Sequence, residues 1–235
     1  MKKSQEIQNK PILNTLKNIS PKKIIAVTKK KPIEAVCLAL KNNITKIGEN
    51  QVQEAQKKFK NFKDRDKIEL HFIGKLQSNK INKAVEIFDV IQTVESKKQI
   101  KKIAKKAKEL NKNQKIYIQI NISEDPKKSG ARKEEIEGLC KIIEEEKNIV
   151  LCGIMTILKK DLKKDSIYLN YKKTKKIQEK IFKNNKKCKE VSMGMSGDYQ
   201  IAIKAGATQV RLGTTLFGKR KWKYIYLKIT KNTLG

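Results

Sequence analysis

Short apolar runs alternate with longer amphipathic stretches along almost the whole chain, and this alternation limits the possible folds more than any other feature. Continuous apolar runs of roughly four to eight residues are typical of buried strands, whereas apolar residues three or four apart indicate helices. The expected strands cover 24–27, 44–47, 69–73, 89–94, 115–121, 150–155, 190–192 and 209–212. The helices expected after the first seven strands cover 33–40, 51–59, 80–88, 96–110, 133–146, 164–184 and 199–205. Eight strand-then-helix units favour a (β/α)8 TIM barrel over an open doubly wound sheet.

We expect residues 1–235 to form one domain. A chain of 235 residues is long enough for a single barrel with a buried core. No repeat, Gly/Ser linker or low-complexity tail indicates a second domain. In such barrels the chemistry lies in the loops after the strand C-termini, and the loops after the seventh and eighth strands often form a phosphate site. The functional residues are therefore expected in these loops.

The net charge of +32 suggests a polyanionic partner such as nucleic acid. Only four of the 56 basic residues are arginines, however, and the lysines are scattered along the expected helices and loops. Base readout and bidentate phosphate recognition favour arginine. A basic nucleic-acid-binding protein is therefore the most remote of the functions that we consider.

Location and metal content are constrained mainly by what the sequence lacks. No stretch approaches the roughly 20 apolar residues that cross a bilayer, and the start of the chain lacks the apolar core of a secretory signal. We therefore expect a soluble, cytoplasmic protein. Cys37, Cys140, Cys152 and Cys188 form no Cys-x-x-Cys pair, and His71 is the only histidine. We expect no metal site, and we expect reduced cysteines in or near the core.

Three consecutive lysines, Lys29, Lys30 and Lys31, stand where the first strand is expected to end. One of them is expected to point into the open end of the barrel. Partial removal from water disfavours the ammonium form of a lysine, so more neutral amine is available to attack an aldehyde. The local pattern does not distinguish such a lysine from three solvated loop lysines.

Two segments rich in small and hydroxyl residues follow the seventh and eighth strands. Ser192–Asp198 contains Gly194 and is expected to open a helix, and Arg211–Gly218 follows the last strand. Backbone N–H groups at helix starts favour anions. Either segment alone is compatible with an ordinary helix cap, but together they occupy the two places where a barrel commonly binds phosphate.

Seven groups of motifs resemble those of the pyridoxal phosphate homeostasis proteins, which in turn resemble the barrel domain of alanine racemase. They occur in the same order and run from the first strand to Arg220. The motifs are 26–29 with Pro32, 47–50, 71–74 with 76–80, 128–130, 153–156, 192–196 and 210–214. The resemblance implies an alanine racemase-like barrel that binds pyridoxal 5'-phosphate (PLP) as its cofactor.

The resemblance also assigns positions. Lys29 matches the lysine that holds PLP as a Schiff base, because it is the first lysine after the strand. Arg211 matches the arginine that faces the pyridine nitrogen. Ser196, Gly213 and Thr214 match the groups around the phosphate.

Asn50 and His71 fall in motifs that line the cofactor pocket of the family. The chain departs from the family at Thr28, where serine is usual before the lysine, and at Lys75, where proline usually follows the Ile-Gly pair. Neither change removes a group that PLP needs, although Lys75 alters the rim of the pocket. Two interpretations of His71 remain: a general base, or a side chain that packs beside the cofactor or at a strand end. The second is favoured, because the neighbours of His71 are apolar.

An arginine opposite the ring nitrogen argues against carbanion chemistry, since a guanidinium cannot accept the pyridinium proton. Alanine racemase tolerates this arrangement with a second domain that supplies a tyrosine, and the chain ends at Gly235 without room for such a domain. We therefore expect a non-catalytic carrier and buffer of PLP, acting in intracellular vitamin B6 homeostasis and releasing PLP to apo-enzymes. The main alternative is a PLP-dependent amino-acid racemase.

Overall fold

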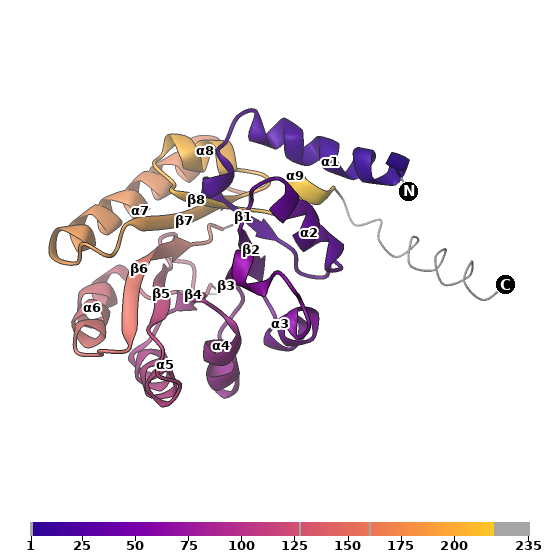
Figure 1. Cartoon of the computed structure of the whole chain (residues 1–235). Helices are drawn as coiled ribbons and strands as arrows, with labels where there is room; N and C mark the ends of the chain where they lie inside the picture. The colour runs from indigo at the N-terminus through magenta and orange to yellow at the C-terminus, as the bar shows by residue number, and fades with distance from the viewer. Residues whose placement is uncertain (1, 127, 160, 219–235) are drawn as a thin grey trace.

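The computed structural model describes residues 2–126, 128–159 and 161–218, and in it eight parallel strands close into a barrel (Figure 1). Each strand pairs with the next along the chain, and the last pairs with the first. The strands are β1 (Ile24–Val27), β2 (Lys46–Glu49), β3 (Glu69–Phe72), β4 (Val90–Val94), β5 (Gln114–Ile120), β6 (Ile149–Thr156), β7 (Glu190–Met195) and β8 (Gln209–Leu212). The predicted (β/α)8 TIM barrel is confirmed.

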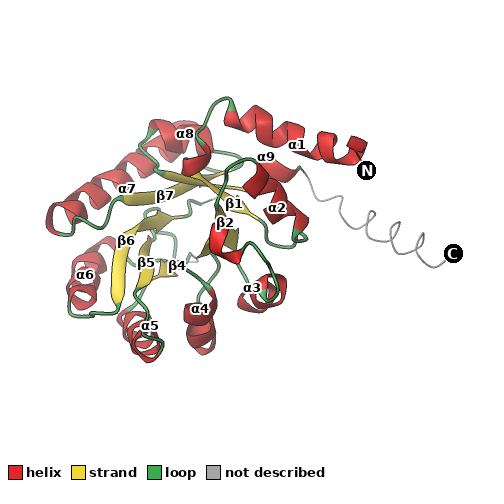
Figure 2. Ribbon diagram, in the orientation of Figure 1, coloured by secondary structure: helices red, strands yellow, loops and turns green. Residues whose placement is uncertain are grey.

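The helices lie outside the strands and separate them from solvent (Figure 2). They are α1 (Lys2–Leu16), α2 (Glu34–Lys41), α3 (Val52–Phe59), α4 (Ile81–Ile87), α5 (Lys97–Glu109), α6 (Ile136–Glu144), α7 (Lys164–Asn184), α8 (Tyr199–Lys204) and α9 (Thr214–Phe217). Seven of them, α2 to α8, follow the strands in turn as predicted. None of the helices in the described part of the chain is long and apolar enough to span a bilayer.

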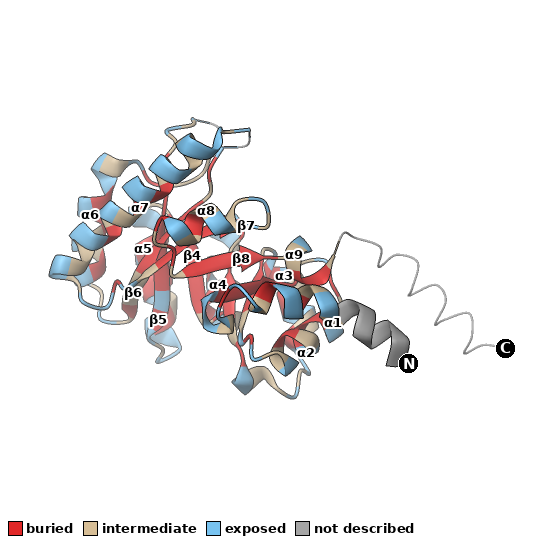
Figure 3. Ribbon diagram, turned by 90° about the horizontal axis from the view of Figure 1, so that it is seen from above, coloured by how far each residue is buried: buried red, intermediate tan, exposed pale blue. Residues whose placement is uncertain are grey.

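The strands are buried on both faces, which explains why they read as continuous apolar runs (Figure 3). Their outer faces and the helices form one large hydrophobic core. The inside of the barrel is partly polar, since Tyr117 on β5 donates its hydroxyl to Gln209 Oε1 on β8 at 3.1 Å. These two strands are not neighbours, so the bond crosses the interior. Polar groups buried this deeply must be hydrogen-bonded to one another.

Most of the predicted boundaries differ from the observed ones by one to three residues, and two of the differences have a clear structural cause. The second strand begins at Lys46 rather than Ile44, because the Ile44 N–H closes the end of α2 by donating to the Ala39 carbonyl at 3.0 Å. The seventh strand continues to Met195, so Gly194 lies within it and does not open a helix as predicted. Gly194 has φ +88° beside a register shift between β7 and β8, so a bulge prolongs the strand.

Two other features were not anticipated correctly. No element was predicted before the first strand, yet α1 packs there against α9 despite Pro11 within it. A proline normally ends a helix, which weakened the sequence signal. The expectation that every cysteine lies in or near the core is wrong for Cys37, which is exposed on α2. The part of the chain that the structure describes contains no group of three His, Cys, Asp or Glu side chains that could hold a metal ion.

The close approach of β6 and β7 at Gly153 provides a test of the barrel. A Cβ on Gly153 would lie 2.3 Å from the Glu190 carbonyl oxygen, so Gly153→Ala should lower the free energy of unfolding by about 1–3 kcal/mol. Gly138→Ala on α6 is the matched control, because nothing lies within 4 Å of the added Cβ. It should stabilise the protein by about 0.5–1 kcal/mol through helix propensity. Equal urea midpoints for the two variants would contradict this strand packing.

Candidate functional site at the barrel mouth

Five of the seven residues predicted from sequence lie at the end of the barrel where the strands finish, which we call the mouth. Lys29 follows β1, Asn50 follows β2, Ser196 follows β7, and Gly213 and Thr214 follow β8. Because all eight strands are parallel, their C-terminal ends share one rim. The structure therefore brings these five positions to one end of the molecule.

The structure distinguishes the three adjacent lysines. Lys30 is exposed and has φ +56°, and Lys31 is buried with its Nζ 5.4 Å from the centroid of the Phe217 ring. The Lys31 N–H donates to the Thr28 carbonyl at 3.0 Å and closes the turn. Lys29, between them, is half-buried. Lys29 is therefore the one lysine of the three that is only partly shielded from water.

A buried carboxylate fixes the start of this turn. Glu49, the last residue of β2, is fully buried, and its Oε1 accepts hydrogen bonds from Thr28 Oγ1 and Lys58 Nζ, each at 2.6 Å. Lys58 Nζ also donates to the Thr28 carbonyl at 2.8 Å. The ion pair of Glu49 with Lys58 thus fixes both the side chain and the backbone carbonyl of Thr28.

The far side of the turn is held from α3. Glu54 Oε1 accepts the backbone N–H of Lys30 at 2.5 Å and lies 3.1 Å from Lys58 Nζ. The positive φ of Lys30 is uncommon for a residue with a side chain, and this hydrogen bond supports it. The backbone on both sides of Lys29 is therefore fastened to the same ion-pair cluster of Glu49, Lys58 and Glu54.

Asn50 supplies an unsatisfied polar atom at the mouth. Its Oδ1 is buried and has no hydrogen-bond partner among the described residues. The loop after β3 passes directly over the Asn50 backbone, since a Cβ on Gly74 would lie 2.1 Å from the Asn50 carbonyl oxygen. A buried acceptor without a partner is costly, so a donor from a ligand would stabilise it.

The loops after β7 and β8 are joined to each other. The Thr215 N–H donates to Ser196 Oγ at 3.2 Å. Asp198 holds the first loop in place, because its two carboxylate oxygens accept the Met195 N–H at 2.6 Å and the Tyr171 hydroxyl at 2.7 Å. The two segments that were predicted to bind phosphate are therefore hydrogen-bonded to each other.

Arg211 on β8 is buried close to the loops that follow β7 and β8. All its hydrogen-bond acceptors are neutral oxygens. Its NH1 donates to the Ser192 carbonyl and to Ser192 Oγ, both at 2.8 Å, and its NH2 donates to the Thr156 carbonyl at 2.8 Å. No carboxylate in the described part of the chain forms an ion pair with it. Burial lowers the pKa of the guanidinium to about 10, so it stays charged at neutral pH.

His71 lies deeper than the other predicted residues. It is fully buried inside the barrel, with Nδ1 2.9 Å from Gln92 Nε2 and Nε2 2.9 Å from Glu69 Oε1. Burial lowers the pKa of the imidazole, which is therefore neutral at pH 7. Both ring nitrogens are engaged, and His71 reaches Arg211 only through intervening side chains.

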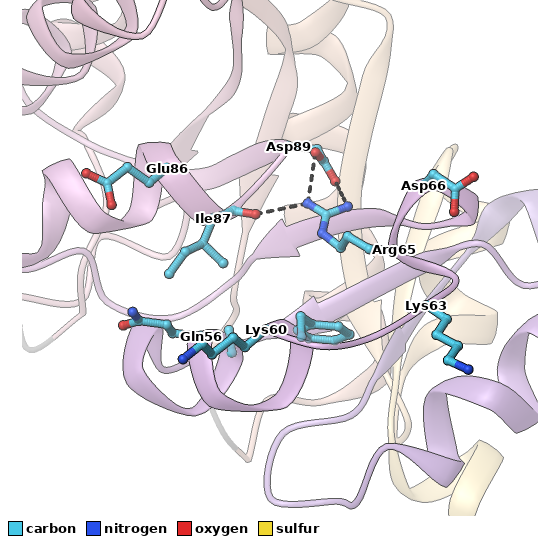
Figure 4. Close-up of a pocket in the computed structure, with 10 residues that line it drawn as sticks. Gln56, Lys60, Lys63, Arg65, Asp66, Glu86, Ile87 and Asp89 are labelled. Atoms are coloured by element: carbon cyan, nitrogen blue, oxygen red, sulfur yellow. Dashed lines mark hydrogen bonds and ion pairs between the residues drawn. The ribbon is translucent and has the colours of Figure 1, made fainter.

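Two cavities lie at opposite ends of the barrel. A cavity of about 220 Å³ at the mouth is lined by residues after β3 and β5, including Lys75 and Lys128, with Thr93 on β4. A groove of about 670 Å³ lies between α3 and α4, where Arg65 pairs with Asp89 (Figure 4). The groove belongs to the opposite end of the barrel, since these two residues precede β3 and β4. None of the predicted site residues lines either cavity.

Several residues that shape the site were not predicted. Glu49 and Ser192 stood inside the quoted motifs without a role, and Lys58 was indistinguishable from other helical lysines. Gln92 carried a usable signal, because a glutamine in the apolar run of β4 indicates a polar barrel interior. The hydrogen-bond partners of Gln92 lie on other strands and depend on the closure of the barrel, so the sequence of β4 could not predict them.

The ion pair beneath the lysine turn makes a sharp prediction. Lys58→Met should lower the free energy of unfolding by about 3 kcal/mol at neutral pH, because it leaves the buried Glu49 carboxylate unpaired. Burial already raises the pKa of Glu49 in the native protein, with Lys58 and Thr28 opposing it. A carboxyl group whose pKa is raised by folding destabilises the folded state as pH rises and the group ionises. Protonation of Glu49 removes the unpaired charge, so the loss of stability caused by Lys58→Met should shrink as pH falls towards 4.5.

The matched control is Lys57→Met, on the exposed face of the same helix, which should change stability by less than about 0.5 kcal/mol. Adding Glu49→Gln to Lys58→Met should recover part of the loss, since no buried charge remains. Urea unfolding from pH 4.5 to 8 measures all of these. A pH-independent penalty for Lys58→Met would contradict the assignment.

Comparison with known proteins identifies the family of the chain. Residues 12–221 match the family model of the alanine racemase N-terminal domain. Pyridoxal phosphate homeostasis proteins are among the relatives. The protein of Synechocystis sp. is 40% identical over 199 residues, covering 84% of this chain and 91% of the relative. The protein of Escherichia coli K12 is 33% identical over 211 residues, covering 86% and 88%.

Solved structures give the same result. PipY of Synechococcus elongatus, determined without PLP, superposes with a TM-score of 0.84 at 30% identity, covering 89% of this chain and 99% of PipY. PipY with PLP bound gives a TM-score of 0.80 at 29% identity, covering 90% and 100%. An alanine racemase of Clostridium difficile shares the fold, with a TM-score of 0.76 at 17% identity over 92% of this chain and 57% of the racemase. The chain therefore belongs to the alanine racemase N-terminal domain family and, within it, to the pyridoxal phosphate homeostasis proteins.

Proposed function

We propose that the protein binds PLP at the barrel mouth, with Lys29 forming the Schiff base, and acts as a carrier and buffer of PLP in the cytoplasm. The observation that carries the proposal is the arrangement around Lys29. Of three adjacent lysines it alone is half-buried, on a turn fastened on both sides, beside a rim built from two joined loops. A related protein of the same size, PipY, is known with PLP bound.

The groups present at the mouth fit the parts of PLP. Ser196, Gly213 and Thr214 would hold the phosphate, at the loops linked by the Thr215–Ser196 hydrogen bond. Gly213 lies against the end of β1, because a Cβ on it would be 3.4 Å from the Val27 carbonyl oxygen. This contact sets the phosphate loop beside the strand that leads to Lys29.

Arg211 and Asn50 would bind the ring. The guanidinium of Arg211 can only donate hydrogen bonds, so it would donate to the pyridine nitrogen and leave that nitrogen without a proton. The buried Oδ1 of Asn50 would gain a donor from the ligand. His71, predicted to line the pocket, has both ring nitrogens occupied inside the barrel and has no direct ligand contact in this proposal.

This donor set supports storage rather than turnover. When bound, PLP supplies an electrophilic aldehyde and, with a protonated ring, an electron sink. Arg211 withholds the ring proton, and no carboxylate in the described part of the chain pairs with Arg211 to alter this. Lys29 would hold the aldehyde reversibly and shield it, so that apo-enzymes receive PLP by exchange.

Borohydride reduction tests the assignment of Lys29. The PLP-loaded protein, reduced and digested, should carry the label on Lys29 alone. Lys29→Ala should lose the label and the visible absorbance of the Schiff base. The control Lys30→Ala changes the exposed neighbour in the same turn and should keep both. Label on Lys30 or Lys31 of the native protein would refute the assignment.

Proton exchange separates a carrier from the alternative, an amino-acid racemase. We expect no exchange of the α-proton when the PLP-loaded protein is incubated with L-alanine or L-serine in deuterated water, because the ring lacks its proton. Proton NMR follows the loss of the α-signal, with free PLP at the same concentration as the reference. Exchange much faster than that reference would establish the racemase instead.

A further inference from the structure

A single line of hydrogen-bonded side chains crosses the inside of the barrel from the mouth to the opposite rim. Arg211 NH1 lies 2.8 Å from Ser192 Oγ, which lies 2.8 Å from Gln92 Oε1. Gln92 Nε2 lies 2.9 Å from His71 Nδ1, and His71 Nε2 lies 2.9 Å from Glu69 Oε1. The line joins β8, β7, β4 and β3, so it exists only in the closed barrel.

The two ends of this line fix its direction. Arg211 can only donate, so Ser192 Oγ accepts there and must use its own proton on Gln92 Oε1. At the other end Glu69 is ionised, because the hydrogen bond from His71 and the contact with Lys115 lower its pKa to about 2. An ionised carboxylate can only accept. Every bond between the ends therefore donates in the same sense, from Arg211 towards Glu69.

The same constraint selects one tautomer of His71. With Gln92 Oε1 accepting from Ser192, Gln92 Nε2 must donate to His71 Nδ1. His71 then carries its proton on Nε2 and donates it to Glu69. The second proton on Gln92 Nε2 is directed at Gln209 Oε1, 3.4 Å away, so both amide protons have acceptors.

The opposite orientation of the Gln92 amide is unfavourable. It would turn Nε2 towards Ser192, whose hydroxyl proton would then have no acceptor. It would also place Oε1 against His71 Nδ1 and force the proton to that nitrogen. His71 Nε2 would then present a lone pair to the Glu69 carboxylate. Leaving buried groups unpaired costs about 1–3 kcal/mol each, enough to populate one orientation almost entirely.

We propose that Ser192, Gln92 and His71 are positioning residues that hold Arg211 towards the mouth through this one-way donor chain, with the tautomer of His71 as its internal marker. The chain orients the guanidinium with neutral dipoles, and the carboxylate that ends the chain, Glu69, lies at the far rim, where it pairs with Lys115. The positive charge therefore stays available at the mouth. The effect on PLP rests on the proposed function, whereas the chain itself does not.

The tautomer is directly measurable because His71 is the only histidine of the chain. The full-length protein without PLP, labelled with ¹⁵N-histidine, should give one pair of imidazole nitrogen signals. At neutral pH they should show a protonated Nε2 and an unprotonated Nδ1. A protonated Nδ1, an imidazolium or equal populations of both tautomers would overturn the proposal, whether or not the protein binds PLP.

Breaking the chain at Ser192 tests the coupling to Arg211. Ser192→Ala should weaken PLP binding about tenfold through the lost hydrogen bond to the charged guanidinium. It should also shift the Nδ1 signal of His71, which it does not touch, because the Gln92 amide loses the donor that holds its Oε1. The proton of His71 should stay on Nε2, since the Glu69 carboxylate still requires a donor there. Ser192→Thr keeps the hydroxyl and should restore both properties. Ser20→Ala, at an exposed serine without a side-chain cap, should change neither.

A second variant covers the case in which Ser192→Ala does not fold, as judged by near-UV circular dichroism. Gln92→Met interrupts the next link with a side chain of similar length and should produce the same two changes. A folded variant of either kind that keeps the native Nδ1 signal of His71, or the native affinity for PLP, overturns the proposal. A native protein that shows the expected tautomer but binds no PLP refutes only the proposed function.

Discussion

Closure of eight parallel strands into one barrel is the constraint on which the rest of this structure depends. Closure places every strand C-terminus at a single rim, so residues as distant in sequence as Asn50 and Ser196 reach the same end of the molecule. It also creates a buried interior, where polar side chains must pair with one another or with the backbone. The location of the site and the hydrogen-bonded interior are both consequences of this closure.

Buried charge is handled in two different ways at the two sides of the mouth. Under the lysine turn, the carboxylate of Glu49 is paired directly with Lys58, which fixes the backbone but leaves little net charge. Under Arg211 the acceptors are neutral oxygens, and the nearest carboxylate on its chain of hydrogen bonds is Glu69 at the far rim. A direct ion pair suits a scaffold, whereas a guanidinium that is bonded only to neutral oxygens, with the Asp198 carboxylate acting on it from outside hydrogen-bond reach, would suit recognition of an unprotonated ligand atom.

The sequence was most informative where structure is local. Apolar periodicity placed all eight strands, because strands buried on both faces show as continuous apolar runs. It failed at Gly194, where a bulge prolongs β7, and at α1, where Pro11 hides a helix stabilised by packing. The positions at the rim followed from the barrel and from family motifs. Glu69, Gln92 and Lys58 did not, because their roles depend on contacts that only the fold creates, such as those of Gln92 with Ser192, 100 positions away, and of Lys58 with Thr28, 30 positions away.

The seam of the barrel links binding to folding. β1 and β8, the first and last strands, pair in parallel with Ile25 opposite Arg211, and Gly213 lies against Val27 at the end of that pair. Under the proposed function the half-buried lysine and the guanidinium would face one ligand, and they come together only after the two ends of the barrel have met. A partly closed sheet can present the fastened turn, which needs only β1, β2 and α3, but it cannot present the donor chain, which joins β7 and β8 to β3 and β4. A ligand that bridges the seam binds the closed state alone and stabilises it by mass action, so retention of the ligand and integrity of the barrel report on the same event.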